Sequence, residues 1–339
     1  MLGKLSAGLL LLLLLPPYTL AEEVGEKGEP LESLVLQLRW ITQAQFAGFY
    51  VALDKGFYRQ HGLDVTILPG GPNRSPAENL QLGATDVSID GLLDILLLRQ
   101  KEGVRLINIA QLFLHSGYSL SCRRDHGIEQ LSDLDGKRIG SWFAGDELMI
   151  MALLSSYGIT AEIYPQNFNV NDLLEGRADC ISTMRYNEYW QLLDRGMREE
   201  EIISFNFDTL GVSTLEDGLY VLESHLRLPR LRQRLVRFIA ATLEGWYYTQ
   251  QHPEEALEII LDNDPTGMLD EKHQRRMLGI VMELVYPEGE HLSSEQYQQL
   301  VGLRYQQTVD LLLERGVLRR APPLAYTTSL WEEAVEQMH

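Results

Sequence analysis

The fold is decided by residues 34–68, which read LVLQLRWITQAQFAGFYVALDKGFYRQHGLDVTIL. Residues 35–38 form a short apolar run typical of a buried strand, and residues 63–68 alternate as a second strand would. Between them, apolar side chains recur at the spacing of an amphipathic helix, at Phe46, Phe49, Tyr50 and Leu53. These elements make one βαβ unit, whose right-handed crossover places both strand ends on one edge of a sheet. Ligands of open α/β sheets bind at that edge, so the sequence predicts an α/β fold with a site there.

The same stretch carries a family likeness. Trp40 is followed by Gln45-Phe46-Ala47-Gly48-Phe49-Tyr50-Val51-Ala52, then Lys55-Gly56-Phe57-Tyr58 and His61-Gly62-Leu63-Asp64-Val65. These residues resemble the opening of periplasmic solute-binding proteins of the thiamine-pyrimidine-synthase-like family, and the similarity continues more weakly to about Leu261. That family includes binding proteins for pyrimidine precursors of thiamine and is related to sulfonate and taurine binders. The plainer interpretation is an ordinary βαβ core unit.

The resemblance implies a two-lobed periplasmic binding protein of type II. In such a protein a hinge links two mainly parallel sheets, and the C-terminal helices pack on the first lobe. The strand, turn and helix signals of this chain alternate in the way that mainly parallel sheets require. A fresh series begins at residue 118, and residues 219–222 read as a strand returning through the hinge. We therefore expect the first lobe at 34–117 and 218–339, and the second lobe at 118–217.

Helix signals are clear at several further places. Ser75 is expected to cap a helix that has Pro76 in its first turn. Residues 128–134 are expected to be helical in the second lobe. After residue 228 the pattern turns helical, with helices expected at 254–261, 272–285, 293–315 and 329–338.

The first 21 residues have the pattern of a secretory signal. Lys4 precedes an unbroken leucine run at 9–15, which is roughly half of the ~20 residues needed to cross a bilayer. We expect cleavage after Ala21, and the alternative is an uncleaved anchor. No Cys stands at the cleavage site to accept a lipid, so we expect a soluble periplasmic protein with a flexible lead-in at 22–33.

The charge of the chain limits its partners. Its 339 residues carry a formal net charge of −19. Removing the signal takes away one positive charge, Lys4, and no acidic residue, which leaves −20. Nucleic acid and anionic membrane surfaces are poor partners for so acidic a protein. The length and the 45% hydrophobic content are sufficient for the cores of two lobes.

The two cysteines, Cys122 and Cys180, lie on predicted strands. An oxidising compartment permits a disulfide between them. Two free buried thiols fit the sequence equally well, because the geometry of a disulfide cannot be read from spacing.

Polar and aromatic residues come directly after several predicted strands. Two sheets that face each other across a hinge would bring these side chains together. Aromatic faces can sandwich a flat ring, which adds about 0.5–1.5 kcal/mol per pair. Carboxylates accept hydrogen bonds from ring amines, each contributing roughly 1.5–3 kcal/mol. We therefore predict a site for a neutral or weakly cationic aminated heterocycle, made of Trp40, Gln45, Asp90, Trp142, Phe143, Tyr186 and Glu188.

Each of these residues also has a purely structural interpretation. Trp40 could be a wall between lobe and helix, and Trp142 with Phe143 could cover the helix that follows them. Asp90 could cap the next helix. Glu188 alone would be solvated, but the resemblance implies a ligand-binding acidic or aromatic pair in its loop.

An anion site, as for sulfonates, is the alternative ligand chemistry. It would need a basic residue and open amides at a helix N-terminus. Gly145 offers such an amide, and Arg39 and Arg185 offer positive charge. Asp146 and Glu147 argue against it, because they occupy the positive end of the same helix.

Synthase activity is the enzymatic alternative. Family members that make the thiamine pyrimidine hold pyridoxal phosphate on a Lys, use a nearby His as substrate and iron-site residue, and carry a cysteine-rich motif. The resemblance places that Lys and His at Asp90 and Asp94, and residues 210–222 contain no Cys. No Schiff base can form on a carboxylate. We therefore expect no enzyme activity, no catalytic residue, no cofactor and no metal.

The predicted function is capture of a small solute for an ABC-type importer. A ligand-sensing partner of a membrane signalling protein is the alternative role, and we expect a monomer. Neither the ligand nor the choice between permease and sensor is given by spacing.

Overall fold

The computed structural model describes residues 30–72, 74–143, 145–289 and 291–338. The predicted signal at 1–21 and residues 22–29 of the predicted lead-in lie outside the described residues. The first strand begins at Glu32, so the last two residues of the predicted lead-in, Glu32 and Ser33, belong to the sheet instead. They pair with Leu63 and Asp64 of the neighbouring strand, which fixes their backbone.

The first sheet has five strands in the order β2-β1-β3-β10-β4. Their bounds are β1 (Glu32–Gln37), β2 (Leu63–Leu68), β3 (Val87–Asp90), β4 (Leu106–Gln111) and β10 (Gly218–Leu222). β1 is parallel to β2 and β3, whereas β10 enters antiparallel between β3 and β4.

The second sheet has five strands in the order β7-β6-β8-β5-β9. Their bounds are β5 (Tyr118–Arg123), β6 (Arg138–Ser141), β7 (Glu162–Pro165), β8 (Cys180–Met184) and β9 (Ile202–Asn206). β5 is antiparallel to β8 and β9, and β6 is parallel to β7 and β8. Each sheet is thus mainly parallel with one antiparallel strand, as predicted.

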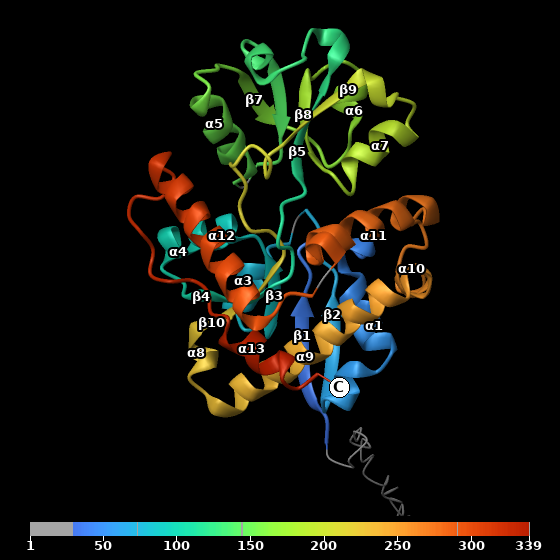
Figure 1. Ribbon diagram of the computed structural model, residues 1–339, viewed down its shortest axis with the longest axis vertical. Helices are drawn as coiled ribbons and strands as arrows, with labels where there is room; N and C mark the ends of the chain where they lie inside the picture. The colour runs from blue at the N-terminus through green and yellow to red at the C-terminus, as the bar shows by residue number, and fades with distance from the viewer. Residues whose placement is uncertain (1–29, 73, 144, 290, 339) are drawn as a thin grey trace, which may run out of the picture.

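Two lobes are built on these sheets, one above the other in Figure 1. The chain passes from the first sheet to the second through residues 112–117 and returns through residues 207–217. We call these segments the outgoing and the returning crossover. The division into two units that move separately stays a prediction.

The opening unit folds as β1, a 3-10 turn η1 (Ala44–Phe46), α1 (Ala47–Asp54), α2 (Phe57–Gln60) and β2. α1 is buried from Ala47 to Ala52 because it lies under α9 (Pro229–Gln251). The two helices touch at glycines: a Cβ on Gly48 would lie 2.2 Å from Trp246 Cδ2. Only a residue without a side chain permits that approach.

The other helices cover both sheets. In the first lobe they are α3 (Pro76–Gln81), α4 (Leu92–Glu102), α8 (Glu223–Leu226), α10 (Pro253–Asp262), α11 (Glu271–Val285), α12 (Ser294–Glu314) and α13 (Ser329–Val335). In the second lobe they are α5 (Asp146–Ser156), α6 (Asn171–Leu174) and α7 (Glu188–Asp194). The Ser75 hydroxyl accepts a hydrogen bond from the Glu78 amide at 3.3 Å, so the predicted cap of α3 is confirmed.

The predicted helix at 128–134 is wrong. Only a 3-10 turn forms there, at Leu131–Leu134. The Asp133 carboxylate accepts hydrogen bonds from the Glu129 and Gln130 amides at 2.9 and 3.1 Å. A short polar side chain that bonds the backbone in this way favours a turn over a helix.

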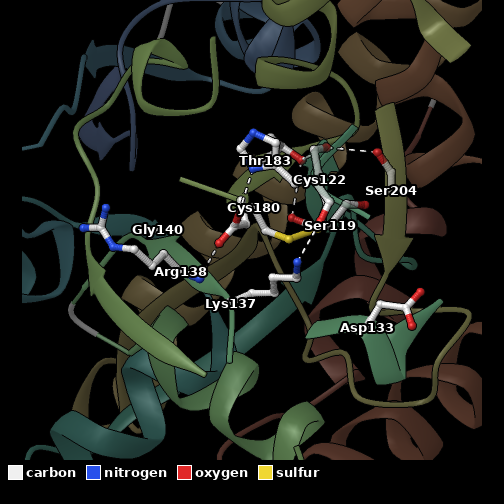
Figure 2. Close-up of a disulfide and its surroundings, with 12 residues drawn as sticks. Ser119, Cys122, Asp133, Lys137, Arg138, Gly140, Cys180, Thr183 and Ser204 are labelled. Atoms are coloured by element: carbon white, nitrogen blue, oxygen red, sulfur yellow. Dashed lines mark hydrogen bonds and ion pairs between the residues drawn. A yellow bond between two sulfur atoms is a disulfide. The ribbon is translucent and has the colours of Figure 1, made fainter. Parts of the chain in front are cut away.

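Cys122 and Cys180 form a disulfide between β5 and β8, where the two residues are direct partners in the ladder (Figure 2). The sequence left the state of these thiols open. In the part of the chain that the structure describes, we find no helix with the length and apolar character needed to span a membrane.

Candidate ligand-binding site

A cavity of about 590 Å³ lies between the two sheets, and both lobes contribute to its wall. The strands explain this convergence, because those that run parallel in each sheet end at the edge facing the cleft. Asp90 ends β3 and Trp142 follows β6 directly, whereas Trp40 and Tyr186 come shortly after the ends of β1 and β8. All the predicted residues line the cavity: Trp40, Gln45, Asp90, Trp142, Phe143, Tyr186 and Glu188.

Arg39 lies at the centre of the cavity's charges. Its Nη1 lies 3.3 Å from Asp217 Oδ1 and its Nη2 lies 3.6 Å from Asp94 Oδ2. Burial acts to lower the pKa of the guanidinium, but Asp217, Asp94 and Asp146 outweigh burial and raise it. Arg39 is therefore a permanent cation whose charge is already balanced by carboxylates.

Glutamine side chains extend this network along the wall. Gln45 Nε2 donates to Asp217 Oδ2 at 2.6 Å, and Gln43 Nε2 donates to Gln45 Oε1 at 2.6 Å. Both amides are buried, so their orientation is fixed by these bonds. Gln45 is thus held in place by Asp217, which does not itself line the cavity.

Asp90 differs from Asp94, because among the described residues it has no ion-pair partner. It is 5% exposed, and its Oδ2 accepts a hydrogen bond from Ser88 Oγ at 2.6 Å. Burial raises the pKa of Asp90 to about 7, with the Ser88 bond acting in the opposite direction. The expected alternative, that Asp90 caps α4, is wrong, because the N-cap residue is Gly91 and no side chain caps that helix.

Asp146 adds a second carboxylate from the opposite lobe. It stands at the start of α5 and lines the cavity. Burial raises the pKa of Asp146 to about 7, and the neighbouring charge of Asp94 acts in the same direction. Acids from both lobes thus lie around Arg39 at the cavity.

Glu188 is buried, so a solvated side chain is wrong for this residue. Its Oε2 accepts a bond from the Met184 amide at 2.9 Å, and its Oε1 accepts one from Asn187 Nδ2 at 2.8 Å. Burial raises the pKa of Glu188 to about 7 despite these bonds. Glu188 therefore holds its own loop together as well as lining the cavity.

Aromatic side chains meet across the cavity from both lobes. Trp40 contacts Phe168, with ring centroids 5.0 Å apart and planes tilted by 46°. Tyr186 meets Phe113 edge-on, with centroids 6.1 Å apart. Phe143 is about half exposed at the cavity. Trp40, Phe143, Phe168 and Tyr186 line the cavity and offer flat faces and edges to a planar ligand, whereas Phe113 is buried behind Tyr186.

The groups that the sequence offered for an anion site all have partners, although the exposed cations Arg74 and Lys101 also line the cavity. The Gly145 amide donates to Glu147 Oε2 at 2.9 Å, so the acid of its own helix already uses it. Arg185 forms an ion pair with Glu283, and Arg39 has two carboxylate partners. This arrangement favours a ligand that donates hydrogen bonds over a ligand that is an anion.

A family model described as NMT1/THI5 like matches residues 43–256. The chain belongs to the NMT1/THI5-like family. It is 24% identical over 266 residues to the formylaminopyrimidine-binding protein of Halalkalibacterium halodurans, which covers 75% of this chain and 78% of that protein. It is 25% identical over 239 residues to the 4-amino-5-hydroxymethyl-2-methylpyrimidine phosphate synthase of Legionella pneumophila, covering 68% and 74%.

The fold is shared with a solved sulfonate binder. The alkanesulfonate-binding protein SsuA from Xanthomonas axonopodis pv. citri, bound to MOPS, superposes with a TM-score of 0.63 at 14% identity, covering 87% of this chain and 98% of that one. The NMT1/THI5-like chain therefore has the two-lobed periplasmic binding protein fold. Its relatives in sequence include both a binding protein and a synthase.

Several residues that line or support the cavity of this NMT1/THI5-like chain were not predicted from the sequence. Phe168 lies in the loop after β7, where no periodicity marks it. Asn187 lines the cavity and positions Glu188. Asp217 is next to β10, and its only signal in the sequence is an acidic residue directly before Gly218.

Proposed function

We propose that this chain is an extracytoplasmic solute-binding protein that captures a small aminated heterocycle, similar to a pyrimidine precursor of thiamine, for an ABC-type importer. The family, the fold and the interlobe cavity support solute binding. The observation that carries the choice of ligand is a contrast between two charged residues. Within the described chain Asp90 has no ion-pair partner, whereas Arg39 has two.

The charges of the cavity favour a hydrogen-bond donor as ligand. An amine or protonated ring nitrogen beside Asp90 would form a charge-assisted bond worth roughly 1.5–3 kcal/mol. A sulfonate would find Arg39 already balanced and would bring its negative charge near Asp94 and Asp146. Repulsion between like charges in a buried site disfavours that outcome.

The aromatic residues favour a flat ligand. Trp40 and Phe168 meet from opposite lobes, and Tyr186 lines the same cavity. A ring held among them would be enclosed on several sides when the lobes close. The volume of about 590 Å³ lies within the range of small-molecule sites, which is roughly 300–1,000 Å³.

A periplasmic location is part of the proposal. The disulfide between Cys122 and Cys180 supports it, because such bonds persist in oxidising compartments. The test is N-terminal sequencing of protein recovered from a periplasmic extract. A first residue of Glu22 supports the proposal, and an intact residue 1 in a cytoplasmic fraction contradicts it.

The ligand class is tested by isothermal titration of the purified protein. The probes are 4-amino-5-hydroxymethyl-2-methylpyrimidine and taurine, and we expect binding of the first only. Asp90→Asn should weaken binding of the pyrimidine at least about tenfold. Glu78→Gln is the matched control, because Glu78 lines the same cavity but is exposed. Tighter binding of taurine than of the pyrimidine would overturn the ligand class.

Synthase activity is not part of the proposal. The positions where the resemblance implies Lys and His are Asp90 and Asp94, and neither carboxylate forms a Schiff base. Addition of pyridoxal phosphate should therefore give no Schiff-base absorbance band.

For the importer role, a deletion strain should lose uptake of labelled pyrimidine and recover it with the wild-type gene.

A further inference from the structure

Two neighbouring acids stand at the end of the returning crossover. Glu216 and Asp217 directly precede β10, whose first residue Gly218 pairs with Asp90 on one side and with Gln111 on the other. Both acids are buried, with 8% and 3% of their surface exposed. The Glu216 carboxylate contacts the outgoing crossover, whereas the Asp217 carboxylate contacts residues of the cavity wall.

Glu216 ties the two crossovers together. Its Oε2 accepts a hydrogen bond from the Gly117 amide at 3.1 Å, and its Oε1 accepts one from the Ser116 hydroxyl. Its backbone carbonyl also accepts a bond from Gln111 Nε2. The returning crossover is therefore fixed to the outgoing one immediately before the chain re-enters the first sheet.

Asp217 connects the same point to the cavity wall. Its two carboxylate oxygens accept from Gln45 and Arg39, at 2.6 and 3.3 Å. Its backbone has a φ of +37°, and among the described residues it alone combines a positive φ with a side chain. Such a conformation is uncommon for a residue with a side chain, and the carboxylate contacts to Gln45 and Arg39 stabilise it here.

The contacts continue into the second lobe. A Cβ on Gly117 would lie 3.0 Å from the Tyr186 ring, so this cavity residue packs directly on the outgoing crossover. One path therefore joins Tyr186, Gly117, Glu216, Asp217 and Gln45, and both of its ends line the cavity.

We propose that Glu216 and Asp217 are positioning residues that couple occupancy of the cavity to the closure of the lobes. This inference rests on the proposed function. Any movement of one lobe against the other changes backbone angles in both crossovers. Because Glu216 makes the crossovers one unit and Asp217 bonds that unit to Gln45 and Arg39, the angle between the lobes and the cavity wall cannot change independently.

The surroundings of Glu216 leave room for this movement. A small polar cavity of about 30 Å³ is lined by Arg39, Asp94, Asp146 and Glu216. Charged side chains from both lobes thus meet at a gap with the volume of about one water molecule, where packing is incomplete. A ligand that contacts Gln45 or Asp146 would favour one arrangement of these side chains over another.

The test measures lobe position and affinity in the same variants. Spin labels on Gln60→Cys and Ser155→Cys, both exposed and on different lobes, report the distance between the lobes with the native disulfide kept intact. The probe ligand is 4-amino-5-hydroxymethyl-2-methylpyrimidine. We expect Asp217→Asn to weaken its binding at least about tenfold and to reduce the ligand-induced change in distance.

Glu216 gives the second arm of the test. Glu216→Gln keeps an oxygen that accepts from the Gly117 amide and should retain most of the closure, whereas Glu216→Ala should broaden the distance distribution even without ligand. Glu255→Gln is the control, because it removes an ion pair with Lys55 inside the first lobe and leaves both crossovers and the contacts between the lobes intact. Circular dichroism verifies that each variant is folded.

The outcomes separate this inference from the proposed function. Normal closure and affinity in both Asp217→Asn and Glu216→Ala would overturn the inference and leave the function standing. A wild-type protein that binds no pyrimidine would overturn the function. The unliganded distance distributions of wild type and Glu216→Ala would then still decide the inference, since identical distributions contradict it.

Discussion

His273 and Asn187 come from different lobes and share a hydrogen bond, with 2.9 Å between His273 Nε2 and Asn187 Oδ1. An amide oxygen only accepts, so the imidazole donates. His273 lies on α11, and the next residue, Gln274, accepts a bond from the Ala44 amide at 2.7 Å. Helix α11 therefore joins the wall of the cavity in the first lobe to the Asn187 loop in the second.

Arg276, one turn further along α11, makes a second contact between the lobes, and we expect the ligand-bound form to keep it. Its guanidinium bonds both oxygens of Asp194 at 2.8 and 2.9 Å and lies 5.0 Å from the centre of the Trp190 ring. A partly exposed ion pair and a cation–π contact each contribute roughly 0.5–1 kcal/mol. Arg276→Ala should therefore weaken ligand binding about fivefold in isothermal titration.

The neighbouring arginine supplies the matched control for that prediction. Arg275 forms ion pairs with Glu254 and Glu271, both in the first lobe. Arg275→Ala removes an equal charge without touching the second lobe, so affinity should stay as in wild type. Equal weakening by both variants would show that charge, not the interlobe contact, sets the affinity.

The raised pKa of Asp90 predicts how the free energy of unfolding depends on pH. Burial raises the pKa of this carboxyl in the folded protein to about 7, from an ordinary value of 3.8. Between these two pH values the folded state binds the proton and the unfolded chain has lost it, so stability falls as pH rises through the window and is level above it. Asp90→Asn should remove this loss, raising stability at pH 8 by on the order of a few kcal/mol and changing little at pH 4.

Thermal unfolding from pH 4 to pH 8.5 measures the effect. Asp64→Asn is the control, because Asp64 is an exposed acid on β2, away from the cavity. A slope against pH that is the same in wild type and Asp90→Asn would show that Asp90 is not the group responsible.

The strand ends could be predicted from the sequence because position along a parallel strand is enough to locate a cleft. Asp90 and Trp142 needed only the end of a predicted strand to be placed at the cleft-facing edges of the first and the second sheet. Partners that depend on the assembled sheets could not be predicted. Arg39 is visible as a basic residue, but its neutralising partner Asp217 stands 178 residues away, before an antiparallel strand inserted between β3 and β4.

Irregular or weakly patterned segments account for the other differences. Strand β9 was not predicted, because Ser204 and Asn206 interrupt its apolar residues at the edge of the second sheet. Phe168 belongs to a loop whose position is set by contact with Trp40 from the other lobe. Contacts of this kind leave no local periodicity in the chain.

The contact of α1 with α9 predicts that two Gly→Ala substitutions change the stability of the protein in opposite directions. Gly48→Ala would place a Cβ 2.2 Å from Trp246 Cδ2, and overpacking of a buried interface destabilises by about 1–3 kcal/mol or more. Gly279→Ala on α11 meets nothing within 4 Å and should stabilise the protein by roughly 0.5–1 kcal/mol through helix propensity. Urea denaturation of both variants decides the matter, and a stabilised Gly48→Ala would contradict the packing described here.

The disulfide predicts a loss of stability without a loss of affinity. The bond between Cys122 and Cys180 closes a loop with a sequence separation of 58, and its removal should lower the free energy of unfolding by about 2–4 kcal/mol. Cys180 begins β8, whereas Met184 at the other end of that strand lines the cavity, so pyrimidine affinity should change less than about twofold. Denaturation and titration of Cys122→Ala combined with Cys180→Ala measure the two effects, and reduced wild type separates the loss of the bond from the loss of sulfur volume. If oxidised and reduced wild type unfold at the same denaturant concentration, the bond does not stabilise the second lobe. If removal of the bond lowers the affinity for the pyrimidine, a change at the Cys180 end of β8 is transmitted to the cavity.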